Sequence, residues 1–194
     1  MDEGWRAETR DERERGWIRA IARKDRQAFE SLFRDYEGRL MRYFGRLVGD
    51  RGLAEELTSD VLFEVWKRAD RFRGDSRPST WIFGIAHHKG VSALRRRRPD
   101  EAAIEPPVTM ADPAPGPERR AAAAERRRTL AEAMRDLSAE HREVLELTYL
   151  EGMTLKEIAT IQGCPVATAK TRLFYARKNL RPLLERVQTG GSPP

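Results

Sequence analysis

Apolar residues recur at spacings of three and four along much of this chain, which is the pattern of amphipathic helices. In the first half the pattern runs through residues 29–47, 53–66 and 81–94. Runs of Gly, Asp, Ser and Pro at residues 49–52 and 74–78 separate these segments and indicate loops. No segment alternates with a period of two for long enough to predict a strand. We therefore expect an all-α protein.

A proline-rich segment divides the chain. Six of the eleven prolines, together with five acidic residues and no Lys or Arg, lie within residues 99–118. Such a segment cannot run as a helix and has little to bury. We predict two small helical domains joined by an extended linker. The alternative is a surface loop within one domain, although a loop of about 20 residues would be unusual.

The second half carries the signature of a helix-turn-helix. Thr154 and Glu157 have the spacing of a capping box, which predicts a short helix over residues 155–161. Gly163 permits a turn, and Pro165 suits the first position of a following helix.

That following helix is predicted over residues 166–184, with Pro182 breaking its end. It holds five basic residues and no acidic one, and two aromatic residues lie on its polar face. A helix of this kind fits the major groove of DNA; a solvated basic face is the alternative. The candidate contacts are Lys170, Thr171, Arg172, Phe174, Tyr175, Arg177 and Lys178.

A second basic region ends the first domain. Residues 87–98 contain Lys89 and four consecutive arginines, and Phe72, Arg73 and Trp81 lie shortly before. Arginine beside aromatic rings suits nucleic acid with accessible bases, because guanidinium groups neutralise phosphate and rings stack on bases. Alternatively, Trp81 belongs to the core and the arginines favour the helix dipole.

An acidic stripe marks the polar side of the segment 53–66, where Glu55, Glu56, Asp60 and Glu64 lie. Because these carboxylates repel phosphate, we expect this side to face away from DNA. It is either ordinary solvated surface or a docking face for a basic protein partner.

Composition narrows the function further. The 194 residues carry 37 basic and 31 acidic side chains, for a net charge of +6. The single cysteine, Cys164, excludes an internal disulfide and fits a reducing cytoplasm. There is no apolar run of 18 residues and no signal peptide at the start. We expect a cytoplasmic protein without direct membrane insertion.

The sequence shows no convincing catalytic or metal-binding motif. His87 and His88 are adjacent and would point about 100° apart on a helix, which makes a poor metal pair. His141 and Cys164 are remote from other ligand types, and no phosphate loop or nucleophile elbow is present. We expect no catalytic activity, no metal and no cofactor.

In order and spacing, these motifs resemble the extracytoplasmic-function (ECF) sigma factors of bacterial RNA polymerase. The segment 54–66 resembles the polymerase-docking helix of that family, and residues 72–76 with 80–86 resemble its −10 recognition loop and helix. Residues 137–145 and 164–177 resemble its −35-binding domain. The resemblance divides the chain into a charged tail (1–19), sigma region 2 (20–98), a linker (99–124), sigma region 4 (125–187) and a second tail (188–194).

The resemblance implies a role for each site. It implies that the protein directs core polymerase to promoters and helps to melt the −10 DNA. The implied residues are Glu56, Asp60 and Glu64 for polymerase binding; Phe72, Arg73, Asp75, Ser76, Trp81 and His88 for the −10 element; and Lys170, Thr171, Arg172, Phe174, Tyr175 and Arg177 for the −35 element.

The partners implied are the clamp helices of the largest polymerase subunit, the flap of the second-largest subunit, promoter DNA and an anti-sigma factor. The chain departs from the family pattern at Ser59, Gly84, His88 and Tyr175. An autonomous helix-turn-helix regulator is the alternative function. It would use a dimer to read paired half-sites, yet the sequence shows no long apolar seam for one.

Overall fold

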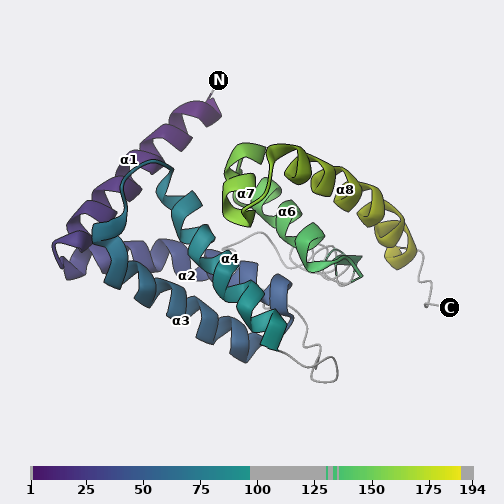
Figure 1. The fold of residues 1–194 in the computed structure, drawn as a ribbon, viewed down its shortest axis with the longest axis horizontal. Coiled ribbons are helices and arrows are strands. Elements are labelled where there is room, and N and C mark those ends of the chain that lie inside the picture. The colour runs from purple at the N-terminus through teal and green to yellow at the C-terminus, as the bar shows by residue number, and fades with distance from the viewer. Residues whose placement is uncertain (1, 97–129, 131–132, 135, 189–194) are drawn as a thin grey trace, which may run out of the picture.

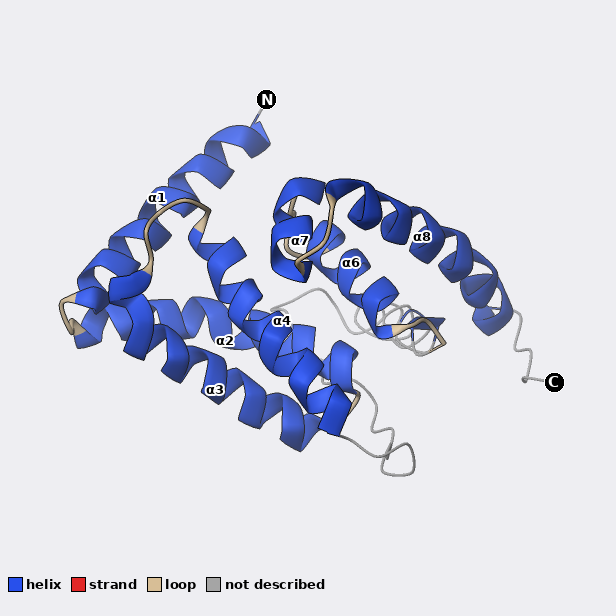
Figure 2. Ribbon diagram, in the orientation of Figure 1, coloured by secondary structure: helices blue, strands red, loops and turns tan. Residues whose placement is uncertain are grey.

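The structure, a computed structural model, describes residues 2–96, 130, 133–134 and 136–188 (Figure 1). Within these ranges the chain forms seven α-helices and one short 3₁₀ turn, and no strand (Figure 2). The predicted all-α class is confirmed. The predicted linker, 99–124, lies outside the described residues, as do most of the second tail and the last two arginines of the basic run.

The N-terminal module packs four helices around an aromatic core. Tyr36, Tyr43, Phe44 and Phe83 are fully buried, and the rings of Tyr43 and Phe83 meet edge to face with centroids 5.4 Å apart. The helices are α1 (Asp2–Ala22), α2 (Arg26–Val48), α3 (Arg51–Arg68) and α4 (Pro78–Arg96), with the turn η1 (Ala69–Arg71) after α3.

Local sequence fixes where these helices begin and end. The carboxylate of Asp25 accepts hydrogen bonds from the backbone of α2, and Asp50 does the same for α3. Between them, Gly49 has a φ of 67°, a left-handed conformation that glycine adopts without steric cost. The predicted loop at residues 49–52 is therefore a tight two-residue connection.

Helix α1 differs from its sequence-based description as a tail. It spans Asp2–Ala22, and Ile18 and Ile21 are buried in the core. Glu14 is also buried, where it forms an ion pair with Arg39 of α2. The many charges of residues 1–19 masked a short apolar edge that is sufficient to pack this helix against α2.

Among the described residues, the C-terminal module includes the helices α6 (Ala139–Tyr149), α7 (Leu155–Gln162) and α8 (Val166–Gln188). The predicted capping box of Thr154 and Glu157 is confirmed, with both reciprocal hydrogen bonds present. Gly163 ends α7 with a φ of 59° and turns the chain into α8.

One prediction about α8 was wrong. The helix continues through Pro182 to Gln188. A proline removes one helical hydrogen bond. Pro182 and Lys178, whose carbonyl loses that bond, are both exposed, so water can satisfy the carbonyl.

The two modules lie directly against each other (Figure 1). Helix α7 of the C-terminal module packs along α4, and α6 packs against α2. Within the described residues, the two-domain layout is therefore a closed one.

Candidate nucleic-acid interface

A loop of six residues, 72–77, joins η1 to α4 and carries most of the predicted −10 residues. The ring of Phe72 packs on that of Trp81 with centroids 5.3 Å apart, and both residues are half-buried. Gly74 has a φ of 81°, which bends the loop in a way that side chains other than glycine resist.

Two polar residues of this loop are open to solvent. Arg73 and Asp75 form an ion pair of 3.1 Å and are both well exposed. Ser76 is half-buried. His88 is exposed and lies two turns beyond Trp81 on the same face of α4. The structure thus gathers Phe72, Trp81 and the loop at one end of α4 and places His88 further along it.

Helix α8 presents an exposed face with aromatic residues. Phe174 is 61% exposed and Tyr175 47%, and their rings meet edge to face. Lys170 and Thr171, one turn earlier, are also exposed. The opposite side of the helix, with Ala169, Leu173 and Ala176, is buried. Large exposed aromatic side chains on a packed helix indicate a binding surface.

Two other predicted −35 residues have partners inside the module. Arg172 is half-buried and donates to the Gln162 side chain at 2.8 Å, which ties α8 to the end of α7. Arg177 places its guanidinium 5.3 Å from the ring of Tyr149 on α6. Both lie at the edges of the exposed face rather than at its centre.

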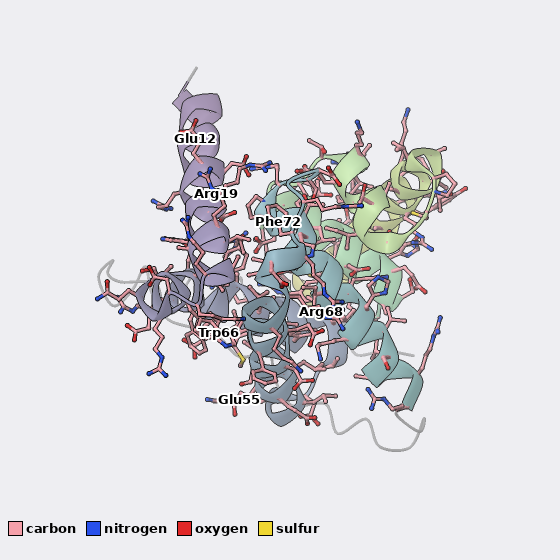
Figure 3. The ribbon with its side chains drawn as sticks, turned by 60° about the vertical axis from the view of Figure 1, so that its left-hand side comes forward. Glu12, Arg19, Glu55, Trp66, Arg68 and Phe72 are labelled. Carbon is pink, nitrogen blue, oxygen red and sulfur yellow. The ribbon has the colours of Figure 1, made fainter. Side chains whose placement is uncertain are left out.

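The acidic face of α3 is open to solvent at Glu56 and Asp60 (Figure 3 shows this helix with its side chains). Asp60 forms an ion pair of 2.9 Å with Lys89 of α4. Glu64 is partly covered and pairs with Arg68. The three predicted docking residues therefore lie along one side of α3, and two of them are partnered.

Phe63 was missed by the sequence analysis. Its side chain is 59% exposed between the acidic residues of α3, with the Lys67 ammonium 5.1 Å from its ring. Its position on the helix could have predicted this exposure, because Phe63 falls outside the apolar stripe that Val61, Leu62 and Val65 form on the buried side.

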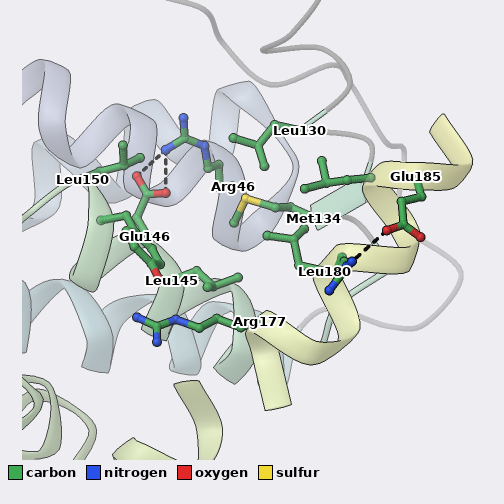
Figure 4. A pocket seen from close by; sticks show the side chains of 12 residues that line it. Arg46, Leu130, Met134, Leu145, Glu146, Leu150, Arg177, Leu180 and Glu185 are labelled. Atoms are coloured by element: carbon green, nitrogen blue, oxygen red, sulfur yellow. Dashed lines mark hydrogen bonds and ion pairs between the residues drawn. The ribbon is translucent and has the colours of Figure 1, made fainter. Parts of the chain in front are cut away.

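A polar interface between the two modules was also missed. Arg46 of α2 donates to both carboxylate oxygens of Glu146 on α6 at 2.5 Å (Figure 4). Arg39 donates to Glu151 at 2.8 Å through Nε. These pairs join residues about 100 positions apart, and no sequence spacing reveals them.

Glu143 lies at the centre of this interface. Its carboxylate is buried and accepts hydrogen bonds from the Tyr43 hydroxyl and from Gln162 at 2.8 Å, and it bonds the His87 ring at 2.8 Å. Burial, and next the charge of Glu143, raises the pKa of Tyr43 well above its usual value. The tyrosine therefore remains a hydrogen-bond donor.

The interface reaches the start of α4. The Glu157 carboxylate, which also caps α7, accepts from Thr80 Oγ1 at 3.2 Å and from Arg77 at 3.4 Å. Arg77 closes the loop 72–77. The C-terminal module therefore touches the same end of α4 that holds Phe72 and Trp81.

An apolar hollow of about 490 Å³ opens between α6, α8 and Arg46 of α2 (Figure 4). Its walls are mostly aliphatic, and Arg46, Glu146 and Arg177 stand at its margins. The aliphatic lining includes Leu130, Met134, Leu145, Leu150, Leu180 and Leu184.

Within the described part of the chain, no group of three or more His, Cys, Asp or Glu side chains has the arrangement of a metal site. His87 is bonded to Glu143, and the Cys164 thiol lies against Gln162 and Arg172. None of the helices described here is both long and apolar enough to cross a membrane.

Comparison with protein families gives two matches that coincide with the two modules. The model of Sigma-70 region 2 matches residues 32–99, and that of Sigma-70 region 4 matches residues 127–180.

Curated relatives match along nearly the whole length. The RNA polymerase sigma-H factor of Pseudomonas aeruginosa is 30% identical over 186 residues, covering 89% of this chain and 96% of the relative. The ECF RNA polymerase sigma factor SigL of Mycobacterium tuberculosis is 29% identical, covering 88% and 96%. SigW of Bacillus subtilis is 27% identical, covering 84% and 92%.

Solved structures show a similar fold. The sigma factor RpoE of Bartonella quintana, solved in complex with the anti-sigma factor NepR, matches with a TM-score of 0.63 and 25% identity, covering 81% of this chain and 96% of that one. CnrH, solved in complex with the cytosolic domain of CnrY, matches with a TM-score of 0.65 and 23% identity, covering 89% and 97%.

Proposed function

Because this chain belongs to the ECF sigma factors of bacterial RNA polymerase, we propose that it binds the core enzyme, reads the −10 and −35 promoter elements and helps to open the DNA at −10. The observation that carries this proposal is the exposed face of α8, where Lys170, Phe174 and Tyr175 follow a capped helix and a glycine turn. We propose no catalytic role for any residue.

Helix α8 enters the major groove at the −35 element. The exposed side chains of Lys170, Thr171 and Phe174 meet base edges there, and Tyr175 extends the contact. Each well-formed base contact contributes roughly 1–3 kcal/mol to discrimination. Arg177 contacts phosphate from the edge of the helix. Arg172, held by Gln162, contributes by fixing α8 on α7 and reaches phosphate only with its remaining donors.

The loop 72–77 and the face of α4 receive the −10 strand. A base taken out of the duplex costs a few kcal/mol, which a preformed pocket can offset. Phe72 and Trp81, packed on each other, supply a rigid apolar wall. Arg73, Asp75 and Ser76 supply hydrogen-bonding groups at the rim. The exposed His88 contacts the strand further along α4.

The acidic side of α3 docks on the clamp helices of the largest polymerase subunit. Glu56, Asp60 and Glu64 supply charge for a basic partner. We add Phe63 to this surface, because an exposed aromatic ring among charges is typical of an interface residue that anchors binding.

Two further partners follow from the family. We propose that the flap of the second-largest subunit docks in the apolar hollow between α6 and α8, because its lining is mostly aliphatic and open to solvent. We also propose regulation by an anti-sigma factor, because RpoE and CnrH were each solved with a protein partner, which for RpoE is named as an anti-sigma factor.

Transcription in vitro with purified core polymerase tests the proposal, using a genomic library and mapping of start sites. The protein is expected to direct initiation from promoters that share −10 and −35 sequences. Tight, sequence-specific binding to duplex DNA by the protein alone, without any effect on core polymerase, would instead indicate an autonomous regulator.

A double variant, Lys170→Ala with Phe174→Ala, tests α8 directly. Transcription from a −35-dependent promoter is expected to be lost while core binding, measured by co-elution, is retained. Asn179→Ala, also exposed on α8, is the control and is expected to be active. Unchanged transcription by the double variant would remove α8 as the −35 reader.

A further inference from the structure

Helix α1 reaches the loop 72–77 through one side chain, Arg15. Its Nη1 donates to the Gly74 carbonyl at 3.2 Å, and its Nη2 donates to the Ser76 carbonyl at 2.9 Å. The same guanidinium stands 5.9 Å from the centre of the Phe72 ring. One side chain thus contacts the loop at three alternate residues.

The helix that carries Arg15 is itself held firmly. Ile18 and Ile21 are buried in the core of the N-terminal module. Upstream, Arg10 pairs with Asp35 of α2 at 2.7 Å, and the buried Glu14 pairs with Arg39. Arg15 therefore projects from a fixed helix and not from a free tail.

The bonds from Arg15 hold the middle of the loop. Its own backbone bonds lie at its two ends, where the Phe72 amide donates to the Ala69 carbonyl and the Trp81 amide donates to the Arg77 carbonyl. Between these ends, Arg15 is the partner of the Gly74 and Ser76 carbonyls. Gly74, with its positive φ, leaves room for the guanidinium, since a Cβ at this position would lie 3.3 Å from Nη1.

The charge of Arg15 is already engaged. Its Nε donates to Asp11 at 2.9 Å within α1, so this carboxylate neutralises the guanidinium locally. We therefore expect Arg15 to contribute less through attraction to phosphate than through its hydrogen bonds to the loop. The guanidinium group is planar and its donors point in fixed directions, a geometry that the lysine ammonium cannot reproduce.

We propose that Arg15 is a positioning residue for −10 recognition, which holds the loop 72–77 and the Phe72 ring in the shape that receives the extracted base. This rests on the proposed function, since it takes the loop as the −10 reader. A site held rigid by a second layer of hydrogen bonds discriminates bases better than a mobile one. Helix α1, which the family model leaves unmatched, then contributes to promoter selectivity.

The first test measures the loop without any DNA. Hydrogen–deuterium exchange is followed in peptides covering residues 72–77 for the full-length protein and for Arg15→Gln, Arg15→Lys and Arg19→Gln. Arg19 is exposed on the same helix and is the matched control (Figure 3). We expect several-fold faster exchange of the Phe72 amide, which donates to the Ala69 carbonyl, in both Arg15 variants and no change in R19Q. Unchanged exchange in R15Q would overturn the proposal.

The second test measures base selectivity with core polymerase. Open-complex formation is compared on a promoter and on the same promoter with one −10 base replaced. The ratio between the two is expected to fall about tenfold in R15Q, the size of one lost charge-assisted hydrogen bond. Binding to core polymerase and the response to a −35 substitution are expected to stay at the wild-type level.

The variants separate the possible outcomes. R15K is expected to remain impaired; recovery of the ratio by lysine would show that charge alone matters and would overturn the proposal. Increased open-complex formation in R15Q would show that Arg15 covers the pocket, which also overturns it. Faster loop exchange with an unchanged −10 selectivity ratio would show that Arg15 stabilises the loop but takes no part in base recognition, which would also overturn the proposal. A wild-type protein that ignores the −10 sequence would instead refute the proposed function.

Discussion

At the scale of single residues, the buried carboxylate of Glu143 shows how this protein tolerates charge in its interior. The residue is 4% exposed, a position at which an unpaired charge would be strongly destabilising. Tyr43, His87 and Gln162 satisfy it from three different helices. Such a residue gives little net stability, but removing one partner leaves a buried group unsatisfied.

Two glycines of α4, Gly84 and Gly90, differ in how much space surrounds them, so their alanine variants can be compared in stability. A Cβ at Gly90 would lie 2.5 Å from Leu47 and 3.4 Å from Phe44, both buried, whereas a Cβ at Gly84 would meet no atom within 4 Å. Both changes to alanine gain the same helix propensity. We expect G90A to be less stable than G84A by about 1–3 kcal/mol, the usual cost of overpacking. Urea denaturation measures the difference; equal midpoints and slopes would contradict the close approach of α2 and α4.

At the scale of helices, the sequence predicted the helices that have a clear apolar periodicity or recognisable capping residues. The capping box at Thr154 and the turn at Gly163 are local features, and both are confirmed. Helix α1 was described as a tail because its composition is dominated by charge. Its packing depends on two isoleucines and on ion pairs to α2. A single sequence does not show which residues form those ion pairs.

In the candidate site, too, the sequence predicted the features set by local pattern and missed the contacts between distant residues. Phe174 and Tyr175 were predicted to lie on the outer face of α8, and that placement follows from helical phase alone. The bonds from Arg15 to the loop cross 59 and 61 positions, so no local pattern contains them. The role of each predicted site residue stays a prediction.

Helix α1 can be tested as an integral element. Ile18→Ala removes a side chain that is 1% exposed, so we expect a loss of about 2–4 kcal/mol in the free energy of unfolding. Arg19→Ala, on the exposed side of the same helix, is expected to change it by less than about 0.5 kcal/mol. Chemical denaturation followed by circular dichroism measures both. An Ile18→Ala variant as stable as the wild type would show that α1 does not belong to the core.

At the scale of the whole molecule, the closed arrangement is incompatible with the proposed task. The −10 and −35 elements are separated by roughly 25 base pairs, which at about 3.4 Å per base pair is about 85 Å of DNA. In the structure α7 packs directly on α4, and Glu157 bonds Arg77 and Thr80 beside the loop 72–77. Under the proposed function the modules must separate before both elements are engaged, and the ion pairs between them would then oppose promoter binding.

This opening is expected to depend on pH through Glu146. Burial is the main cause that raises the pKa of Glu146 to about 7, against the opposing effect of Arg46. When the modules separate, the carboxylate regains water and its pKa returns toward the usual value near 4.5. Between these two values the closed form binds more protons than the open form, so raising the pH removes stability from the closed form.

Small-angle X-ray scattering between pH 5 and 8 measures the effect. The radius of gyration is expected to rise with pH in the wild-type protein. Glu146→Gln, which cannot ionise, is expected to flatten this rise. Burial alone would raise the pKa of Glu157, but hydrogen bonds from Thr154 lower it overall, so its titration falls below this range.

His87 bonds Glu143 across the same interface, so His87→Gln, which alters a different contact, is measured alongside Glu146→Gln. If the rise persists in Glu146→Gln, the pH response does not come from Glu146. A radius of gyration independent of pH in the wild-type protein would show that protons do not control the separation of the modules, which would then depend on the polymerase and the promoter to pull them apart.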